Sequence, residues 1–301
     1  TVAVSRSRRR TRELTLRLMM SLLVFVAVLA GLYSMVPPRS DFVTNAPAAV
    51  VKFDQAVDYF QTNLSNKPVL VVFDYQPAYH EEISVYAELP LATLMAQDAR
   101  IFTFSTVAEG PALAQKMLFD VVMSNGLQYN TTSQAVPLGY LPGGSNAIRD
   151  FSLQMRSTVH GLDVGSSGTY VWDLPNVTDV DSIDDFALVL VLTDDLDKAR
   201  LWIEQSTLYL PETTPMLMVT SARISPMLRP YLLSEQLDGL IGNAVDAAAY
   251  GNPELSNRVG NYIYYWRAYQ LGIYLMVATV IAGALLQIMR QLQRAFKRGK
   301  S

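Results

Sequence analysis

Two long apolar segments without charge, one near each end of the chain, constrain its fold more than any other feature. Residues 18–36 form one such segment and residues 268–289 form the other. In a helix, about 20 apolar residues span the ~30 Å hydrocarbon core of a bilayer. Basic residues precede the first segment and follow the second. Because basic flanks stay on the cytoplasmic side, we expect two transmembrane helices, cytoplasmic termini and an outward-facing middle.

The distribution of charge agrees with this topology. Residues 38–267 contain 13 Lys and Arg against 26 Asp and Glu, a net charge of −13, whereas the two ends together carry +10. A segment with this much negative charge is poorly suited to binding nucleic acid, because that binding depends on neutralising phosphates. Anionic lipid headgroups also repel it. We therefore expect a domain that stands off the membrane and has no nucleic-acid partner.

The absence of cysteine indicates the compartment. A domain of about 230 residues can be stabilised by its core alone, so it needs no disulfides. An outward-facing domain without them is more typical of a bacterium or archaeon than of a secreted animal protein. We therefore place the chain in a prokaryotic cytoplasmic membrane. The alternative for the first segment is a cleaved signal peptide, although its apolar run is longer than such peptides usually have.

Between the anchors, short apolar runs alternate with stretches of helical periodicity. Strands are predicted at residues 69–73, 101–104, 135–141, 186–192, 216–219 and 239–241. Helices are predicted at residues 50–64, 81–96, 111–124, 146–155, 196–205 and 225–234. Strands that are apolar on both faces are typical of a parallel sheet covered by helices. We therefore predict an α/β, Rossmann-like three-layer domain with a mostly parallel sheet and an irregular insertion at residues 156–185.

The predicted organisation follows from these segments. It comprises a basic tail (1–17), transmembrane helix (18–36), linker (37–49), α/β domain (50–252), juxtamembrane helix (253–267), second transmembrane helix (268–289) and basic tail (290–301). This layout is similar in topology to that of the bacterial polysaccharide co-polymerases. The proline-rich segment that those proteins carry before their second membrane helix is absent here.

Two acidic loops follow predicted strands, where ligands bind in parallel α/β sheets. Asp74 and His80 come after the first strand with Glu81 and Glu82, and these side chains could bind a metal or carry acid–base chemistry. Asp194 and Asp195 follow the strand at 186–192, a position at which carboxylates can hold Mg²⁺. In each loop the acids are equally suited to capping the next helix.

A third candidate loop contains Gly143, Gly144 and Ser145 before a predicted helix. Glycines at a helix N-terminus allow backbone amides to approach an anion, although the Lys-Ser/Thr of a P-loop is missing. The alternative is a tight turn. Nucleophilic catalysis has little support, because Ser221 follows a strand without the flanking glycines of a nucleophile elbow.

These patterns favour a non-catalytic, membrane-anchored protein. Its outward-facing domain would serve as an accessory or scaffold subunit, with the lipid bilayer and other membrane-protein subunits or further copies of itself as partners. One alternative is an extracytoplasmic domain that binds or senses a small molecule. The other is a metal-dependent hydrolase or transferase that uses the same acidic loops. The sequence assigns no catalytic residue, cofactor or resident metal.

Overall fold

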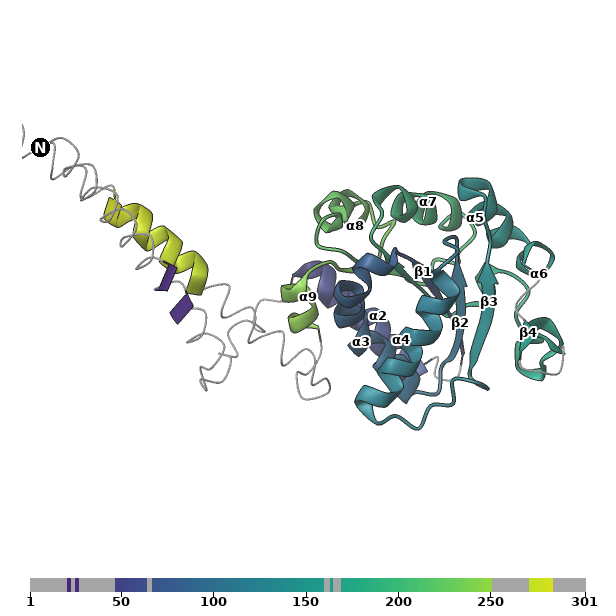
Figure 1. The fold of residues 1–301 in the computed structure, drawn as a ribbon. Helices are drawn as coiled ribbons and strands as arrows, with labels where there is room; N and C mark the ends of the chain where they lie inside the picture. The colour runs from purple at the N-terminus through teal and green to yellow at the C-terminus, as the bar shows by residue number, and fades with distance from the viewer. Residues whose placement is uncertain are drawn as a thin grey trace, which may run out of the picture. The chain divides into compact units, whose positions relative to one another are not determined.

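The chain divides into two compact units, residues 39–260 and residues 1–38 together with 261–301. The computed structural model describes residues 21–22, 25–26, 47–63, 67–159, 163–164, 169–250 and 271–283. In the first unit these residues form the α/β domain of Figure 1. In the second unit all described residues are helical.

The first predicted membrane span lies largely outside the described residues, as do both basic tails and most of the linker, whereas residues 271–283 of the second span are described. The predicted juxtamembrane helix, residues 253–267, lies wholly outside the described residues. Among the residues that are described, no helix has the length and apolar character needed to cross a membrane. The described parts of the spans do expose apolar side chains, including Phe25, Met276 and Val280.

Six parallel strands form the sheet of the domain. They are β1 (Pro68–Asp74), β2 (Arg100–Ser105), β3 (Ala135–Tyr140), β6 (Leu188–Thr193), β7 (Met216–Thr220) and β8 (Gly239–Ile241). Their order is β3-β2-β1-β6-β7-β8, and each neighbouring pair is parallel. Counted along the chain within this sheet, that is the doubly wound order 3-2-1-4-5-6. The predicted Rossmann-like architecture is confirmed, and the strands at 135–141 and 239–241 are the two edges of one sheet.

Helices cover both faces of the sheet (Figure 1). One layer contains α2 (Ala48–Asn63), α3 (His80–Ala96), α4 (Gly110–Asn125) and α9 (Ala244–Ala249). The other contains α5 (Gly144–Leu153), α6 (Met155–Thr158), α7 (Leu196–Ser206) and α8 (Arg229–Leu233). Successive side chains of a strand point to opposite faces. Accordingly, Val71 of β1 packs in the first layer and Val72 in the second.

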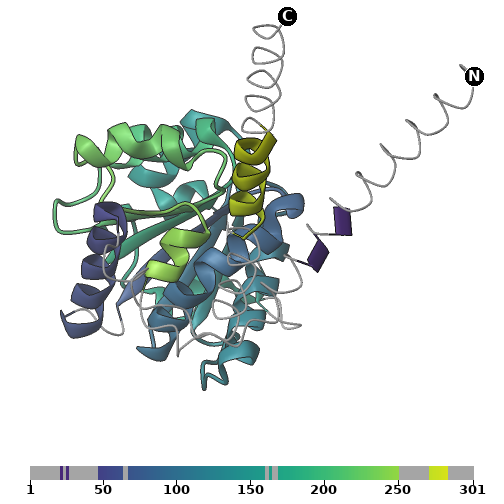
Figure 2. The same ribbon diagram turned by 90° about the vertical axis from the view of Figure 1, so that its left-hand side faces the viewer.

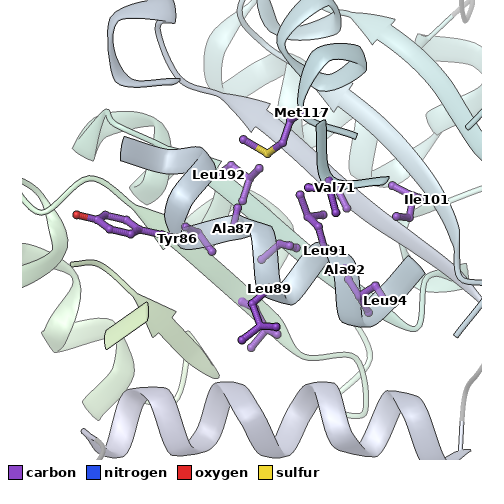
Figure 3. Close-up of a cluster of buried hydrophobic side chains, with 14 of the residues drawn as sticks. Val71, Tyr86, Ala87, Leu89, Leu91, Ala92, Leu94, Ile101, Met117 and Leu192 are labelled. Atoms are coloured by element: carbon purple, nitrogen blue, oxygen red, sulfur yellow. The ribbon is translucent and has the colours of Figure 1, made fainter. Parts of the chain in front are cut away.

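Helix α3 is the centre of the first layer. Most of its residues are buried, which is typical of a helix that is apolar all round rather than along one stripe. Figure 3 shows its side chains, such as Leu91, among Val71 of β1, Ile101 of β2 and Met117 of α4. The domain core on this side is therefore built around one nearly enclosed helix.

Proline interrupts one predicted helix. Residues 225–234 form a 3₁₀ turn, η6 (Ser225–Leu228), followed by the short α8. Proline has no N–H to donate, and it disfavours helical geometry in the residue before it. Pro226 and Pro230 stand in the first turns of these two pieces, so the segment is broken into short turns.

The insertion at 156–185 is irregular, as predicted, with short local elements. A small antiparallel pair joins β4 (Asp163–Val164) to β5 (Thr169–Tyr170). Three 3₁₀ turns follow: η3 (Val171–Asp173), η4 (Pro175–Val177) and η5 (Ile183–Asp185). Arg100 at the start of β2 binds Asp179 through two hydrogen bonds, of 2.6 and 2.7 Å. This ion pair holds the pKa of Asp179 below its usual range.

Both edges of the sheet are protected. Edge strand β3 carries Pro137, a residue that central strands avoid because it cannot donate to the ladder. The side-chain amide of Asn176 in the insertion donates to the carbonyl of Ser133, just before this strand, at 2.8 Å. At the other edge β8 has three residues and packs against α2. Short and covered edges resist pairing with other chains.

The first helix of the described domain contacts the residue that follows the last helix. The rings of Phe53 in α2 and Tyr250 just after α9 meet edge to face, with centroids 5.2 Å apart. Phe53 also lies against Gly239, where an added Cβ would be 2.6 Å from the Phe53 Cα. Figures 1 and 2 both place α9 beside α3, in the layer that contains α2. The chain therefore enters and leaves this domain at neighbouring points.

Gly239→Ala tests this contact. The new methyl group would collide with backbone atoms of α2, which cannot rotate away, so we expect a loss of at least about 2 kcal/mol in the free energy of unfolding. Gly126→Ala is the control: its φ is 60° and nothing lies within 4 Å of the new Cβ. It should lose only about 1 kcal/mol, from its left-handed backbone. Chemical denaturation measures both, and equal losses would show that α2 is loosely docked.

Candidate functional site

The strand order reverses between β1 and β6, and this is where doubly wound folds bind ligands, beyond the carboxyl ends of the strands. Asp74 ends β1, whereas Asp194 and Asp195 follow β6. Because β1 and β6 are neighbours, the structure brings these two acidic loops together. The loop with Gly143 follows β3, on the far side of β2, and is not part of the same crevice.

The carboxylate of Asp74 is fully buried and has four donor groups within hydrogen-bond distance. Its Oδ1 accepts from the backbone N–H of Thr106 at 2.6 Å and from the hydroxyl of Ser105 at 3.1 Å. Its Oδ2 accepts from the Thr106 hydroxyl and from the indole N–H of Trp202, both at 2.8 Å. Two donor groups thus face each oxygen of the carboxylate, which matches the accepting capacity of a carboxylate oxygen. Asp74 therefore links β1, β2 and α7, which is a structural role.

Asp194 closes the crevice between the two loops. Its side chain is nearly fully buried, and Oδ1 accepts from the backbone N–H of Gln76 at 3.0 Å. The guanidinium of Arg223 donates to the Asp194 carbonyl, also at 3.0 Å, and lies 5.4 Å from the centre of the Tyr79 ring. The hydroxyl of Thr193 donates to the carbonyl of Asp74 at 2.9 Å. The walls of the crevice are thus bonded directly to each other.

Asp195 caps helix α7. Its Oδ1 accepts from the backbone N–H groups of Asp197 and Lys198, at 2.8 and 3.4 Å. Such bonds satisfy donors that the first turn of a helix leaves open. Of the two readings that the sequence left for this acid, the geometry is that of a cap.

His80 begins α3 and lies against Tyr75. The two rings are stacked, and the Tyr75 hydroxyl is 3.1 Å from Nδ1 of His80. Burial raises the pKa of Tyr75, so its hydroxyl stays protonated. Both side chains are buried, and Tyr75 belongs to the hydrophobic core of the layer that contains α3.

Gly143 precedes α5 and Gly144 begins it, with Ser145 in the first turn of that helix. Their φ angles are 136° and 58°, which side chains with a Cβ rarely adopt. A Cβ at Gly143 would also lie 3.0 Å from that of Ala147. The backbone geometry by itself accounts for both glycines.

The acidic side chains do not converge on one point. Within the described part of the chain, no group of three or more His, Asp or Glu residues is arranged to hold a metal ion. Asp74 and Asp195 instead face separate sets of donors. The arrangement serves to join the loops of the sheet.

Two buried hydroxyls lie beside this edge, and sequence reasoning missed one of them, that of Thr220. Thr220 and Ser221, at the end of β7, are fully buried, and their hydroxyl oxygens have no hydrogen-bond partner among the described residues. The next residue, Ala222, donates its N–H to Glu82 of α3 at 2.8 Å. Unsatisfied buried hydroxyls are uncommon in folded proteins. The sequence signalled only Ser221, from its place after a strand.

Sequence reasoning also missed a groove at the opposite end of the sheet. It has a volume of about 740 Å³ and lies between α2, the loop before β7 and the loop before β8. The rule for parallel sheets points to the carboxyl ends of the strands, whereas this groove lies at their amino ends. The three segments are far apart in the sequence, so no local motif marks it.

Comparison with known proteins assigns no function to the crevice or to the groove. No family model matches the chain, and no curated protein or solved structure is significantly similar to it.

Asp74→Asn tests the structural role of this acid. An amide places a donor where the carboxylate accepts, so at least one of the four donors loses its partner in the core. We expect a loss of about 3 kcal/mol in the free energy of unfolding. Asp195→Asn is the matched control, because asparagine caps a helix as well as aspartate does, and should change stability by less than about 0.5 kcal/mol. Similar stabilities for both variants would contradict the role assigned to Asp74.

Proposed function

We propose that the chain is a membrane-anchored protein whose outward-facing Rossmann-like domain serves as an accessory or scaffold subunit of a membrane complex. In this proposal both termini are cytoplasmic, and segments 18–36 and 268–289 span a prokaryotic cytoplasmic membrane. The domain works through its outer surface and carries out no catalysis.

The observation that carries this proposal is the internal closure of the crevice. The acids that could serve catalysis there are held by donors of the fold, with Asp74 bound to Trp202 and Asp194 to Gln76. A catalytic acid or base must instead reach the proton of a substrate. A domain that uses these acids to join its own loops is suited to a structural role.

Two further observations support the membrane topology. The domain brings its ends together, because Phe53 near its start contacts Tyr250 near its end. Neighbouring ends are compatible with two anchors in one bilayer. In residues 271–283, Met276 and Val280 are 62% and 67% exposed. Apolar side chains are stable at such exposure when lipid surrounds them.

Binding of a small molecule is the second candidate function. Two observations favour it: the unpartnered hydroxyls of Thr220 and Ser221, and the groove at the amino ends of the strands. No observation of this kind favours a metal-dependent hydrolase or transferase.

Single cysteines test the topology, because the natural chain has none to interfere. We expect a membrane-impermeant maleimide to label Ser157→Cys, an exposed position of the domain, in intact spheroplasts. Ser301→Cys at the C-terminus should be labelled only after permeabilisation, and the natural chain never. Labelling of Ser301→Cys in intact spheroplasts, or its absence at Ser157→Cys, would rule out this orientation.

The composition of the native particle tests the accessory role. We expect the chain, extracted from its own membrane in mild detergent, to purify with other subunits in a fixed ratio. Native mass spectrometry measures that ratio. A particle that contains only this chain would contradict the accessory role and favour ligand binding.

A further inference from the structure

The groove at the amino ends of β7 and β8 has defined walls. Lys52, Gln55 and Tyr59 line it from one side of α2, at spacings of three and four residues that place them on a single helix face. The loop before β7 forms the opposite wall and contains Pro211 and Pro215. Proline fixes its own φ angle, so this wall is stiff.

The floor and one end of the groove carry carboxylates. Asp238 in the floor is half-buried, and it accepts a hydrogen bond of 2.8 Å from the N–H of Met216. Burial raises the pKa of Asp238. At the end, Glu235 has a left-handed backbone with φ 59° and lies 3.7 Å from the Lys52 ammonium. Both partners of this ion pair are exposed, so it is weak and can exchange for bonds to a ligand.

The lining offers both hydrogen-bond donors and hydrogen-bond acceptors. Lys52 only donates, ionised Asp238 and Glu235 only accept, and Gln55 and Gln236 do both. A half-exposed aromatic ring, that of Tyr59, stands among them. Vicinal hydroxyl groups donate and accept at once, and the C–H faces of a sugar ring stack on an aromatic side chain. A mixed polar lining beside a tyrosine therefore matches a polyhydroxylated ligand.

Other ligand classes fit this lining less well. An anion would meet Glu212, Glu235 and Asp238 against the single lysine of the lining. An apolar molecule would cover polar groups without replacing their hydrogen bonds to water. A compound with several amines would use the acceptors and leave the donors unsatisfied. The volume of about 740 Å³ lies in the ~300–1,000 Å³ range of small-molecule sites.

We propose that this groove binds a saccharide. The ring of the sugar stacks on Tyr59, and its hydroxyl groups bond to Asp238, Gln55 and Gln236. The site is independent of the crevice at the carboxyl ends of the strands. It also goes beyond the accessory role, because it holds whether or not the chain has partner subunits.

Saturation-transfer NMR on the full chain in lipid nanodiscs tests the proposal. The probes are a panel of mono- and disaccharides that covers neutral, N-acetylated and uronic acid sugars, with spermidine as the amine control. We expect binding of at least one sugar in the millimolar range and none of spermidine. Tyr59→Ala should weaken the binding by about tenfold, because it removes the stacking surface. Tyr140→Ala is the matched control, an exposed tyrosine on the opposite edge strand, and should bind as the natural chain does.

A second variant distinguishes the loss of a ligand contact from misfolding of the domain. Gln236→Ala changes an exposed side chain outside the core and should also weaken the binding, with an unchanged circular dichroism spectrum. Binding of spermidine without any sugar would overturn the proposal in favour of an amine site. Absence of binding by the whole panel would overturn it outright. Sugar binding that survives both Tyr59→Ala and Gln236→Ala would place the ligand elsewhere and equally refute it.

Discussion

The buried carboxylate of Asp74 is the interaction on which the centre of the domain depends. It lies at the end of a central strand and bonds to β2 through Thr106 and to α7 through the indole of Trp202. Removing a charge from water is costly unless hydrogen bonds replace its hydration, and here four donors do so. The hydrogen bond from the Trp202 indole to Asp74 also orients the Trp202 ring, which meets Phe104 and Phe151 edge to face. One acid therefore fixes both the strand ends and the aromatic core beneath α7.

This arrangement also decides what the crevice can do. Doubly wound domains that bind dinucleotides place glycines after the first strand, so that backbone amides approach a phosphate. Here a 3₁₀ turn, η2 (Pro77–Tyr79), stands in that place, and the N–H of Gln76 is already bonded to Asp194. The bonds that stabilise the centre of the sheet thus occupy the groups with which a ligand would pair. This favours a domain that acts through its outer surface and the groove beside α2.

The sequence predicted the fold better than it predicted the candidate site. Strands such as β6 are continuous apolar runs, and a buried parallel sheet is the environment that such runs require. The role of Asp74 depends instead on Ser105 and Trp202, which are 31 and 128 residues away along the chain. A carboxylate after a strand has the same local pattern whether solvent or four donors surround it. The groove beside α2 was equally invisible, because its walls meet only in the folded domain.

Helix α2 connects these features. Its Phe53 backbone lies so close to Gly239 that the helix is docked directly on the edge strand β8, and the same residue meets Tyr250 where the described domain ends. The opposite face of α2 carries Gln55 and Tyr59, which line the groove. The segment before α2 is the linker from the first predicted anchor. In the proposed topology, a ligand in the groove would contact the helix that joins the first anchor to the sheet, and α2 would be the element through which ligand binding and membrane attachment influence each other.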